Sequence, residues 1–183
     1  TDTNALFAAL EFSVTALEKG VQPIVGCQLS LGEGPHAGPV VLLAQDRAGW
    51  ENLMALSSAL YLREGGAPPH VTEDELLAHA GGLICLTGGA TGPLGRMVAA
   101  GRIEEARGWL GRLAAGFGDR LYVELQRHPS EAGPLMPAEA ASEAGMIDLA
   151  YDLDLPLVAT NDVHFPGPEM FEAHDALLCI ADK

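Results

Sequence analysis

The sequence predicts an α/β domain built on a mostly parallel sheet that helices cover on both faces. Its apolar runs are short and lack clean alternation of apolar and polar residues, which is typical of strands buried on both sides. Longer stretches with helical periodicity separate these runs, and turn residues mark the boundaries. An open doubly wound sheet and a (β/α) barrel both fit this order, because periodicity alone does not distinguish them.

The expected strands are the apolar runs that Gly, Pro or charged residues bound on each side. They cover residues 21–31, 39–44, 82–87, 121–126 and 155–160. Residues 65–70, rich in Gly and Pro, are expected to form a loop, and residues 88–92 a flexible connection.

Helices are expected between these runs. Asn4 is placed to cap the first helix, which Gly20 ends, and Thr72 with Glu75 has the spacing of a capping box. Asp46 opens a longer helix with apolar residues on one side. The remaining helices are expected over residues 94–100, 103–115, 138–151 and 169–180.

Composition and charge describe one acidic domain over residues 1–183. The chain has 10 Lys and Arg against 25 Asp and Glu, a formal net charge of −15. This balance argues against strong direct DNA binding, because nucleic-acid affinity comes mainly from Lys and Arg that displace counterions. It also argues against an anionic membrane surface. No apolar stretch reaches the roughly 18 residues of a membrane span and no export signal opens the chain, so we expect a cytoplasmic location.

The three cysteines, Cys27, Cys85 and Cys179, each lie among apolar residues and lack metal-ligand spacing. They are expected to be reduced thiols in the core of a cytoplasmic protein.

Polar residues that follow the expected strands are the candidates for chemistry, because α/β folds place their sites at the carboxyl ends of strands. Asp162 and His164 follow the last strand two residues apart, so both side chains can face one side and share a divalent metal. The alternative interpretation is an Asp that caps the next turn beside a surface His.

Glu124 and His128 flank another strand end. They are interpreted either as an acid–base or ligand pair or, preferably, as a buried carboxylate paired with Arg120 or Arg127 and a solvated imidazole. Residues 88–92 lack the lysine of a P-loop and the register of a dinucleotide fingerprint, so a plain loop is favoured over a phosphate cradle. The other histidines are expected to face solvent; they are His36, His70, His79 and His174.

The opening TDTNALF reads similarly to a "TDHGN-F" motif, and VQPIVGCQ to an "IKPIIGCE" motif. Through these segments the chain resembles the N-terminal polymerase-and-histidinol-phosphatase (PHP) domain of bacterial DNA polymerase III alpha subunits. The similar segments run in the family's order through essentially the whole chain, at residues 1–7, 21–28, 42–53, 122–128, 155–164 and 173–180. The chain also starts without Met on what looks like the exit of a strand, so an upstream strand is expected to be missing.

The resemblance implies a distorted (β/α)7 barrel, incomplete at its N-terminus, with a metal cluster at its mouth. It aligns the family's ligands with Thr3, Gln28 and Gly89, none of which replaces a histidine, glutamate or cysteine ligand well. Asp162 and His164 match the final ligand pair. We therefore expect a degenerate, vestigial site with no bound cofactor; Glu124 and His128 are further residues expected at the mouth.

The resemblance implies a non-catalytic domain of a replicative polymerase chain that serves as a scaffold and as the docking surface for a proofreading exonuclease subunit. The rest of the alpha chain, which makes DNA, would be its other partner. The alternative is an active metal-dependent phosphoesterase or 3′–5′ exonuclease of the same fold, with Zn or Mn bound once the upstream strand is present. An unrelated small-molecule enzyme of the α/β class is the third hypothesis. A barrel lacking a strand also exposes a sheet edge, which predicts marginal stability or edge pairing.

Overall fold

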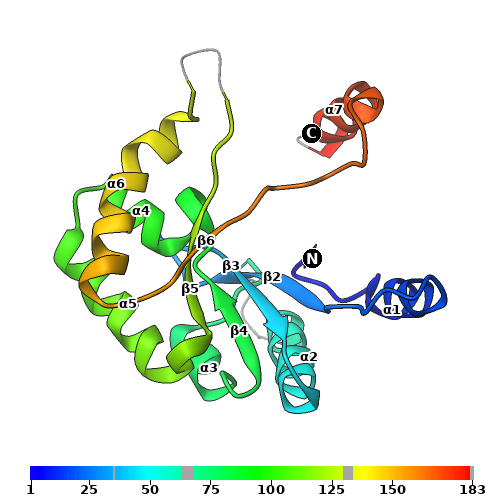
Figure 1. The fold of residues 1–183 in the computed structure, drawn as a ribbon, viewed down its shortest axis with the longest axis horizontal. Helices are drawn as coiled ribbons and strands as arrows, with labels where there is room; N and C mark the ends of the chain where they lie inside the picture. The colour runs from blue at the N-terminus through cyan, green and yellow to red at the C-terminus, as the bar shows by residue number, and fades with distance from the viewer. Residues whose placement is uncertain (35, 63–67, 130–133, 182–183) are drawn as a thin grey trace.

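The computed structural model describes residues 1–34, 36–62, 68–129 and 134–181 (Figure 1). Within these residues, six strands lie side by side in chain order and form one open sheet. The strands are β1 (Asp2–Thr3), β2 (Gly26–Leu31), β3 (Gly38–Ala44), β4 (Leu83–Leu86), β5 (Leu121–Leu125) and β6 (Leu157–Ala159). Residues 65–67 of the expected loop lie outside the described residues.

Strand β3 is antiparallel to both of its neighbours, whereas the other pairs are parallel. Residues 32–37, which join β2 to β3, are too few to hold a crossover helix, so the chain turns back on itself as a hairpin. The expectation of a mostly parallel sheet therefore holds outside β3 and is wrong around it. The sheet does not close, and β1 and β6 are its two edges.

Five helices contribute to one core on a single face of the sheet (Figure 1). These are α2 (Arg47–Leu62), α3 (Glu73–Ala78), α4 (Pro93–Ala99), α5 (Ile103–Phe117) and α6 (Pro137–Asp152). Thr72 and Glu75 form the predicted capping box at the start of α3. The expected cover on both faces is thus wrong for the described residues. Two further helices, α1 (Ala9–Glu18) and α7 (Phe171–Ala181), contain no buried residue.

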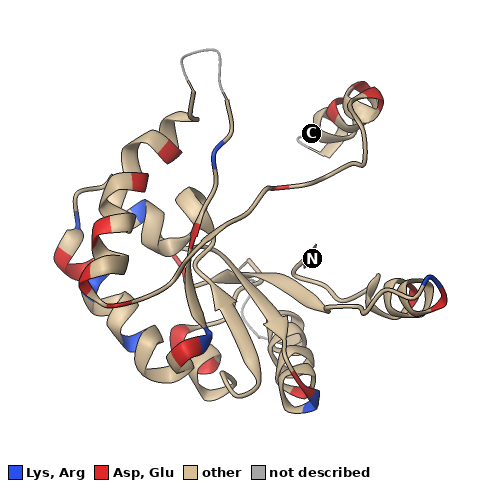
Figure 2. Cartoon of the chain, in the orientation of Figure 1, with Lys and Arg blue, Asp and Glu red and all other residues tan. Residues whose placement is uncertain are grey.

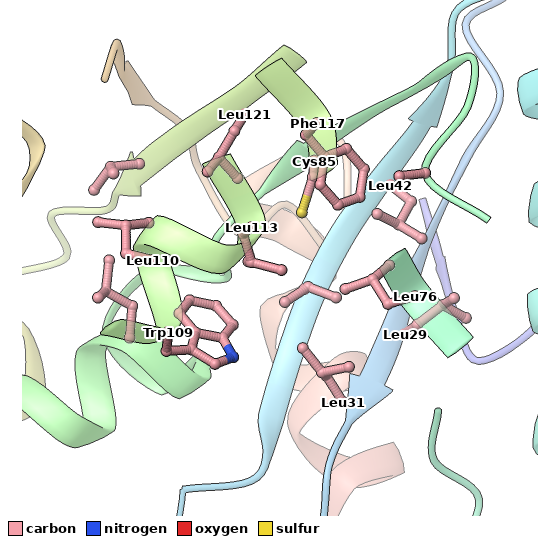
Figure 3. Close-up of a cluster of buried hydrophobic side chains, with 14 of the residues drawn as sticks. Leu29, Leu31, Leu42, Leu76, Cys85, Trp109, Leu110, Leu113, Phe117 and Leu121 are labelled. Carbon is pink, nitrogen blue, oxygen red and sulfur yellow. The ribbon is translucent and has the colours of Figure 1, made fainter. Parts of the chain in front are cut away.

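The core explains why only one sheet face is covered (Figure 3). In β2, Cys27, Leu29 and Leu31 are buried, whereas Gln28 and Ser30 between them are half-buried. This alternation is the period of two expected for a strand with one covered face. Each fully buried leucine stabilises the fold by about 1.5–3 kcal/mol, so the apolar face fixes the strand register.

The opposite face carries the residues in which function is to be sought. Because paired residues share a face, the register places Thr3 beside Gln28, Gln28 beside Val41, and Val41 beside Leu86. Glu124 of β5 continues this row, two residues beyond the partner of Leu86. The α/β class is therefore confirmed, and its second face forms the floor of a candidate site.

Asn4 does not cap the first helix as predicted. Its backbone is left-handed (φ 55°), and its side chain bridges to Ser30, accepting from the Ser30 amide (Oδ1···N 2.8 Å) and donating to the Ser30 hydroxyl (3.0 Å). Helix α1 begins five residues later, and the amide of Ala8 donates to the Asp2 carboxylate at 3.1 Å. Asn4 thus fastens the chain after β1 to β2.

Residues 88–92 are packed rather than flexible. A 3₁₀ turn covers Gly89–Thr91, and Gly88 is left-handed with φ 80°. A Cβ on Gly88 would lie 1.8 Å from the carbonyl oxygen of Pro39, and one on Gly92 would lie 2.1 Å from that of Thr87. Glycine is required here because β3 passes directly against the turn.

We predict that Gly88→Ala destabilises the chain far more than Gly101→Ala. Both glycines have a left-handed backbone, but a Cβ on Gly101 meets nothing within 4 Å. Gly101→Ala should cost about 1–2 kcal/mol for the backbone alone, and Gly88→Ala about 1–3 kcal/mol more because of the clash. Urea unfolding of both variants measures the difference; equal losses would show that the close approach to Pro39 does not matter.

Candidate functional site

A polar cavity of about 350 Å³ opens at the mouth of the sheet, on the face away from the helices. Five residues that the sequence singled out line it together. They are Thr3, Gln28, Glu124, Asp162 and His164. The structure therefore brings together five of the residues that the strand-end argument and the resemblance singled out, although His128 is absent from the lining.

Glu124 is the buried centre of this site, with 2 % of its surface exposed. Its Oε2 accepts from the backbone amide of Gly88 at 2.9 Å, and its Oε1 accepts from the hydroxyl of Thr160 at 2.5 Å. The predicted pairing with Arg120 or Arg127 is wrong. Arg120 donates to backbone carbonyls near β4, and Arg127 pairs with a glutamate of α6.

Thr160 and Gln126 complete a directional hydrogen-bond chain that the sequence did not reveal. The Gln126 amide donates to the Thr160 hydroxyl at 3.3 Å, and that hydroxyl donates to Glu124. The Glu124 amide in turn donates to the Thr87 hydroxyl at 3.0 Å. The only sequence signal was that Gln126 and Thr160 both follow strands. This network ties the ends of β4, β5 and β6 together.

Asp162 and His164 form the pair that their spacing suggested. His164 Nε2 lies 3.1 Å from Asp162 Oδ2, and the two side chains are 52 % and 61 % exposed. The His164 ring also lies 4.9 Å from the ring of His174, centroid to centroid. The pair is therefore formed, but it sits on the exposed segment after β6 rather than on the floor of the sheet.

His128 pairs with Glu139 of α6, not with Glu124. The imidazole Nδ1 lies 2.7 Å from Glu139 Oε1, and the His128 amide donates to Oε2 at 2.9 Å. Burial alone raises the pKa of Glu139, but the hydrogen bonds from His128 and from the Met136 amide outweigh it and hold that pKa below its ordinary value. The interpretation of Glu124 and His128 as an acid–base pair is thus wrong.

Two further expectations about single residues are corrected. His70 is buried (6 % exposed), with Nδ1 2.9 Å from the carbonyl oxygen of Pro68 and Nε2 3.2 Å from Glu33. Cys179 is exposed, whereas Cys27 and Cys85 are buried as expected. Burial, with the charge of Glu124 nearby, raises the pKa of the Cys85 thiol, so this thiol is neutral and unreactive.

Comparison with known proteins places the chain in a family. A family model described as the PHP domain matches residues 1–128. The chain belongs to the PHP domain family. The chain is 46 % identical, over 99 % of its length, to the DNA polymerase III subunit alpha of Caulobacter vibrioides. The same subunit is 38 % identical in Rickettsia bellii, over 99 % of the chain, and 32 % identical in Thermus aquaticus, over the whole chain.

The chain spans only 15–16 % of the length of these relatives. In the described stretches of the PHP domain, no helix is both long and apolar enough to cross a membrane.

The residues at the mouth of the PHP domain do not fit the multi-metal cluster that the family implies. Gly89 has no side chain to offer as a ligand, and a Cβ there would lie 3.0 Å from Oε1 of Gln126, so the end of the Gln126 side chain would have to shift to admit one. Thr3 and Gln28 offer only a hydroxyl and an amide, and Glu124 is already engaged by two donors. Among the described residues, no three His, Cys, Asp or Glu side chains converge as metal ligands.

We predict that Glu124→Ala lowers the stability of the PHP domain by about 2–4 kcal/mol, because the Gly88 amide and the Thr160 hydroxyl lose a buried charged acceptor. Glu51→Ala is the control, since Glu51 pairs with Arg47 on the surface and its loss costs about 0–1 kcal/mol. Chemical denaturation measures both. Equal small losses would show that the Glu124 network does not hold the strand ends.

The Glu139–His128 contact predicts a pH-dependent contribution. The folded pKa of Glu139 is lowered, so its stabilisation is present above the ordinary glutamate pKa and is lost as pH falls through the folded pKa. Glu139→Gln should cost about 1–2 kcal/mol at pH 7 and progressively less as pH falls below about 4. Glu143→Gln, on the same helix, is the control variant. If unfolding curves show that Glu139→Gln lowers the stability equally at pH 7 and below about pH 4, this assignment is contradicted.

Proposed function

We propose that this chain is the non-catalytic PHP domain of a DNA polymerase III alpha subunit, whose parent chain carries out DNA-directed DNA synthesis in the cytoplasm. In this proposal the domain is a scaffold for the rest of the alpha chain and a docking surface for a proofreading exonuclease subunit. The similarity to alpha subunits over nearly the whole chain supports the proposal that the parent chain is a DNA polymerase III alpha subunit.

One observation supports the absence of catalysis. Both oxygens of Glu124, the buried carboxylate of the mouth, already accept hydrogen bonds, one from the Gly88 amide and one from the Thr160 hydroxyl, so this carboxylate has a structural role. The remaining Asp162–His164 pair supplies two ligands on an exposed segment, fewer than a tight site needs.

The charge of the domain supports a protein partner over DNA. The formal net charge is −15, and Figure 2 shows Asp and Glu spread over the outer helices. Such a surface repels the phosphate backbone and attracts a basic protein surface. The proposal is therefore that the exonuclease meets this domain through a basic patch, with binding that weakens as salt rises.

Metal content is the measurement that tests the absence of catalysis. The full-length alpha subunit carrying this domain, purified without chelator, should hold no stoichiometric zinc or manganese by elemental analysis. Its phosphoesterase and 3′–5′ exonuclease rates should not change in Asp162→Ala or His164→Ala.

Stoichiometric metal that is lost in the Asp162→Ala variant would overturn this proposal. It would favour the second candidate, an active metal-dependent phosphoesterase or 3′–5′ exonuclease. The contact between Asp162 and His164 at the mouth is the observation that favours that candidate.

Docking is tested on the complex of the full-length alpha subunit with its exonuclease subunit. Carboxyl-directed cross-linking suits this domain, which has 25 Asp and Glu. We expect cross-links from the exonuclease to residues 1–183 and a rise in Kd of about tenfold or more between 50 and 200 mM salt. Cross-links that map only outside residues 1–183 would contradict docking on this domain.

A further inference from the structure

A second cavity, of about 530 Å³, lies at the connection between β2 and β3. Its walls come from residues 30, 32–34 and 37–39 of this hairpin, from residues 68–70 and from Arg96 of α4. Among the described residues, it shares no lining residue with the mouth of the sheet. Cavities of roughly 300–1,000 Å³ hold small organic molecules, so this volume suits a ligand larger than a single ion.

His70 is the buried polar group of this cavity, with 7 % of its side chain exposed. Its Nδ1 lies 2.9 Å from the carbonyl oxygen of Pro68, and its Nε2 lies 3.2 Å from Oε1 of Glu33. A carbonyl and a carboxylate only accept hydrogen bonds, so the ring bonds to both only when each nitrogen carries a proton. In that form the imidazole is a cation, and a buried cation needs a facing anion.

The backbone beside His70 holds the ring in place. The amide of Val71 donates to the carbonyl oxygen of Ser30 at 2.9 Å, and the amide of Gly32 donates to that of Val71 at 2.8 Å. These bonds form an isolated parallel bridge between Leu31 and Val71 at the end of β2. The imidazole is therefore preorganised, and a ligand does not have to order it.

Arg96 supplies a second cation to the cavity. Its Nε donates to the carbonyl oxygen of Thr91 at 2.8 Å, which fixes the guanidinium, and no carboxylate in the described part of the chain pairs with it. Its remaining N–H groups can therefore bind the oxygens of a ligand anion. Most other described arginines already pair with an Asp or Glu; they are Arg47, Arg102, Arg107, Arg112 and Arg127.

Glu33 shows which chemistry His70 accepts from the cavity side. Its carboxylate contacts the ring, yet 66 % of its side chain is exposed. Glu33 lies outside the core, on the connection between β2 and β3, so its side chain can leave the ring without disturbing the fold. An ion pair with one exposed partner contributes little, and an anion from solution can therefore replace this carboxylate.

We propose that this cavity, the His70–Arg96 cavity, binds a small organic anion. The carboxylate or phosphate group of the ligand replaces Glu33 on His70 and also bonds to Arg96. The rings of Pro39, Pro68 and Pro69 provide apolar contact for the rest of the molecule. The inference concerns a site outside the mouth of the sheet and does not rest on the proposed function.

Hydrogen exchange on the full-length polypeptide that carries this domain tests the proposal. The probes are benzoate, phenyl phosphate and benzamide, which is the uncharged analogue of benzoate. We expect at least one of the two anions, at saturation, to slow exchange of the amides of residues 30–34 and 70–72 by about threefold or more, and benzamide to leave it unchanged. The more effective anion identifies the preferred group, carboxylate or phosphate.

Three variants locate the anion, and each Kd is read from the dose dependence of exchange at residues 30–34. Arg96→Gln should raise the Kd by about tenfold or more, because a charged hydrogen-bond donor is lost. Glu33→Gln should lower it by about two- to fivefold, because the competing carboxylate is gone. Arg47→Gln is the control, since Arg47 pairs with Glu51 on the surface of α2 and should leave the Kd within about twofold.

Opposite effects of Arg96→Gln and Glu33→Gln cannot both come from loss of folding, and exchange of the α5 amides without probe checks that each variant is folded. Equal slowing by benzoate and benzamide would overturn the proposal, because charge would then not be recognised. Absence of slowing by both anions would also overturn it. A Kd that rises in Glu33→Gln would show that the anion does not take the place of Glu33, which would overturn the proposed position.

Discussion

The buried carboxylate of Glu124 is the constraint around which the mouth of the sheet is organised. A carboxylate removed from water costs several kcal/mol unless hydrogen bonds replace its hydration. Glu124 meets this condition with the Gly88 amide and the Thr160 hydroxyl. That requirement fixes the conformation of the turn after β4. This turn passes so close to Pro39 that only glycine fits at position 88.

The same network explains how a PHP domain holds its strand ends together without converging metal ligands among its described residues. A metal cluster binds side chains from several strands at one point. In this domain, a row of hydrogen-bond donors and acceptors connects the strand ends instead. Gln126 donates to Thr160, and Thr160 donates to Glu124, so each group satisfies the next. Hydrogen bonds of this kind are directional, so each one fixes the orientation of the next group in the row.

The hydrophobic core and the uncovered helices divide the chain into two kinds of structure. Strands β2–β5 and helices α2–α6 share one core, in which leucines such as Leu42 and Leu110 are fully buried. Helices α1 and α7 contribute nothing to it. The charge of −15 belongs largely to the outside of the packed part, where it keeps the surface repulsive to polyanions.

Local pattern by itself determined the α/β class, most of the strands and helices, and the region of the candidate site. Apolar runs and caps act over a few residues, so the capping box of Thr72 and the strand ends at Glu124 and Asp162 were readable in the chain. Only the tertiary structure decided the reversal of β3, the open sheet, and the partners of the polar residues. Glu124 bonds to Thr160 rather than to a neighbouring arginine, and His128 bonds to Glu139. Those choices depend on which strands and helices lie side by side, and sequence spacing does not carry that information.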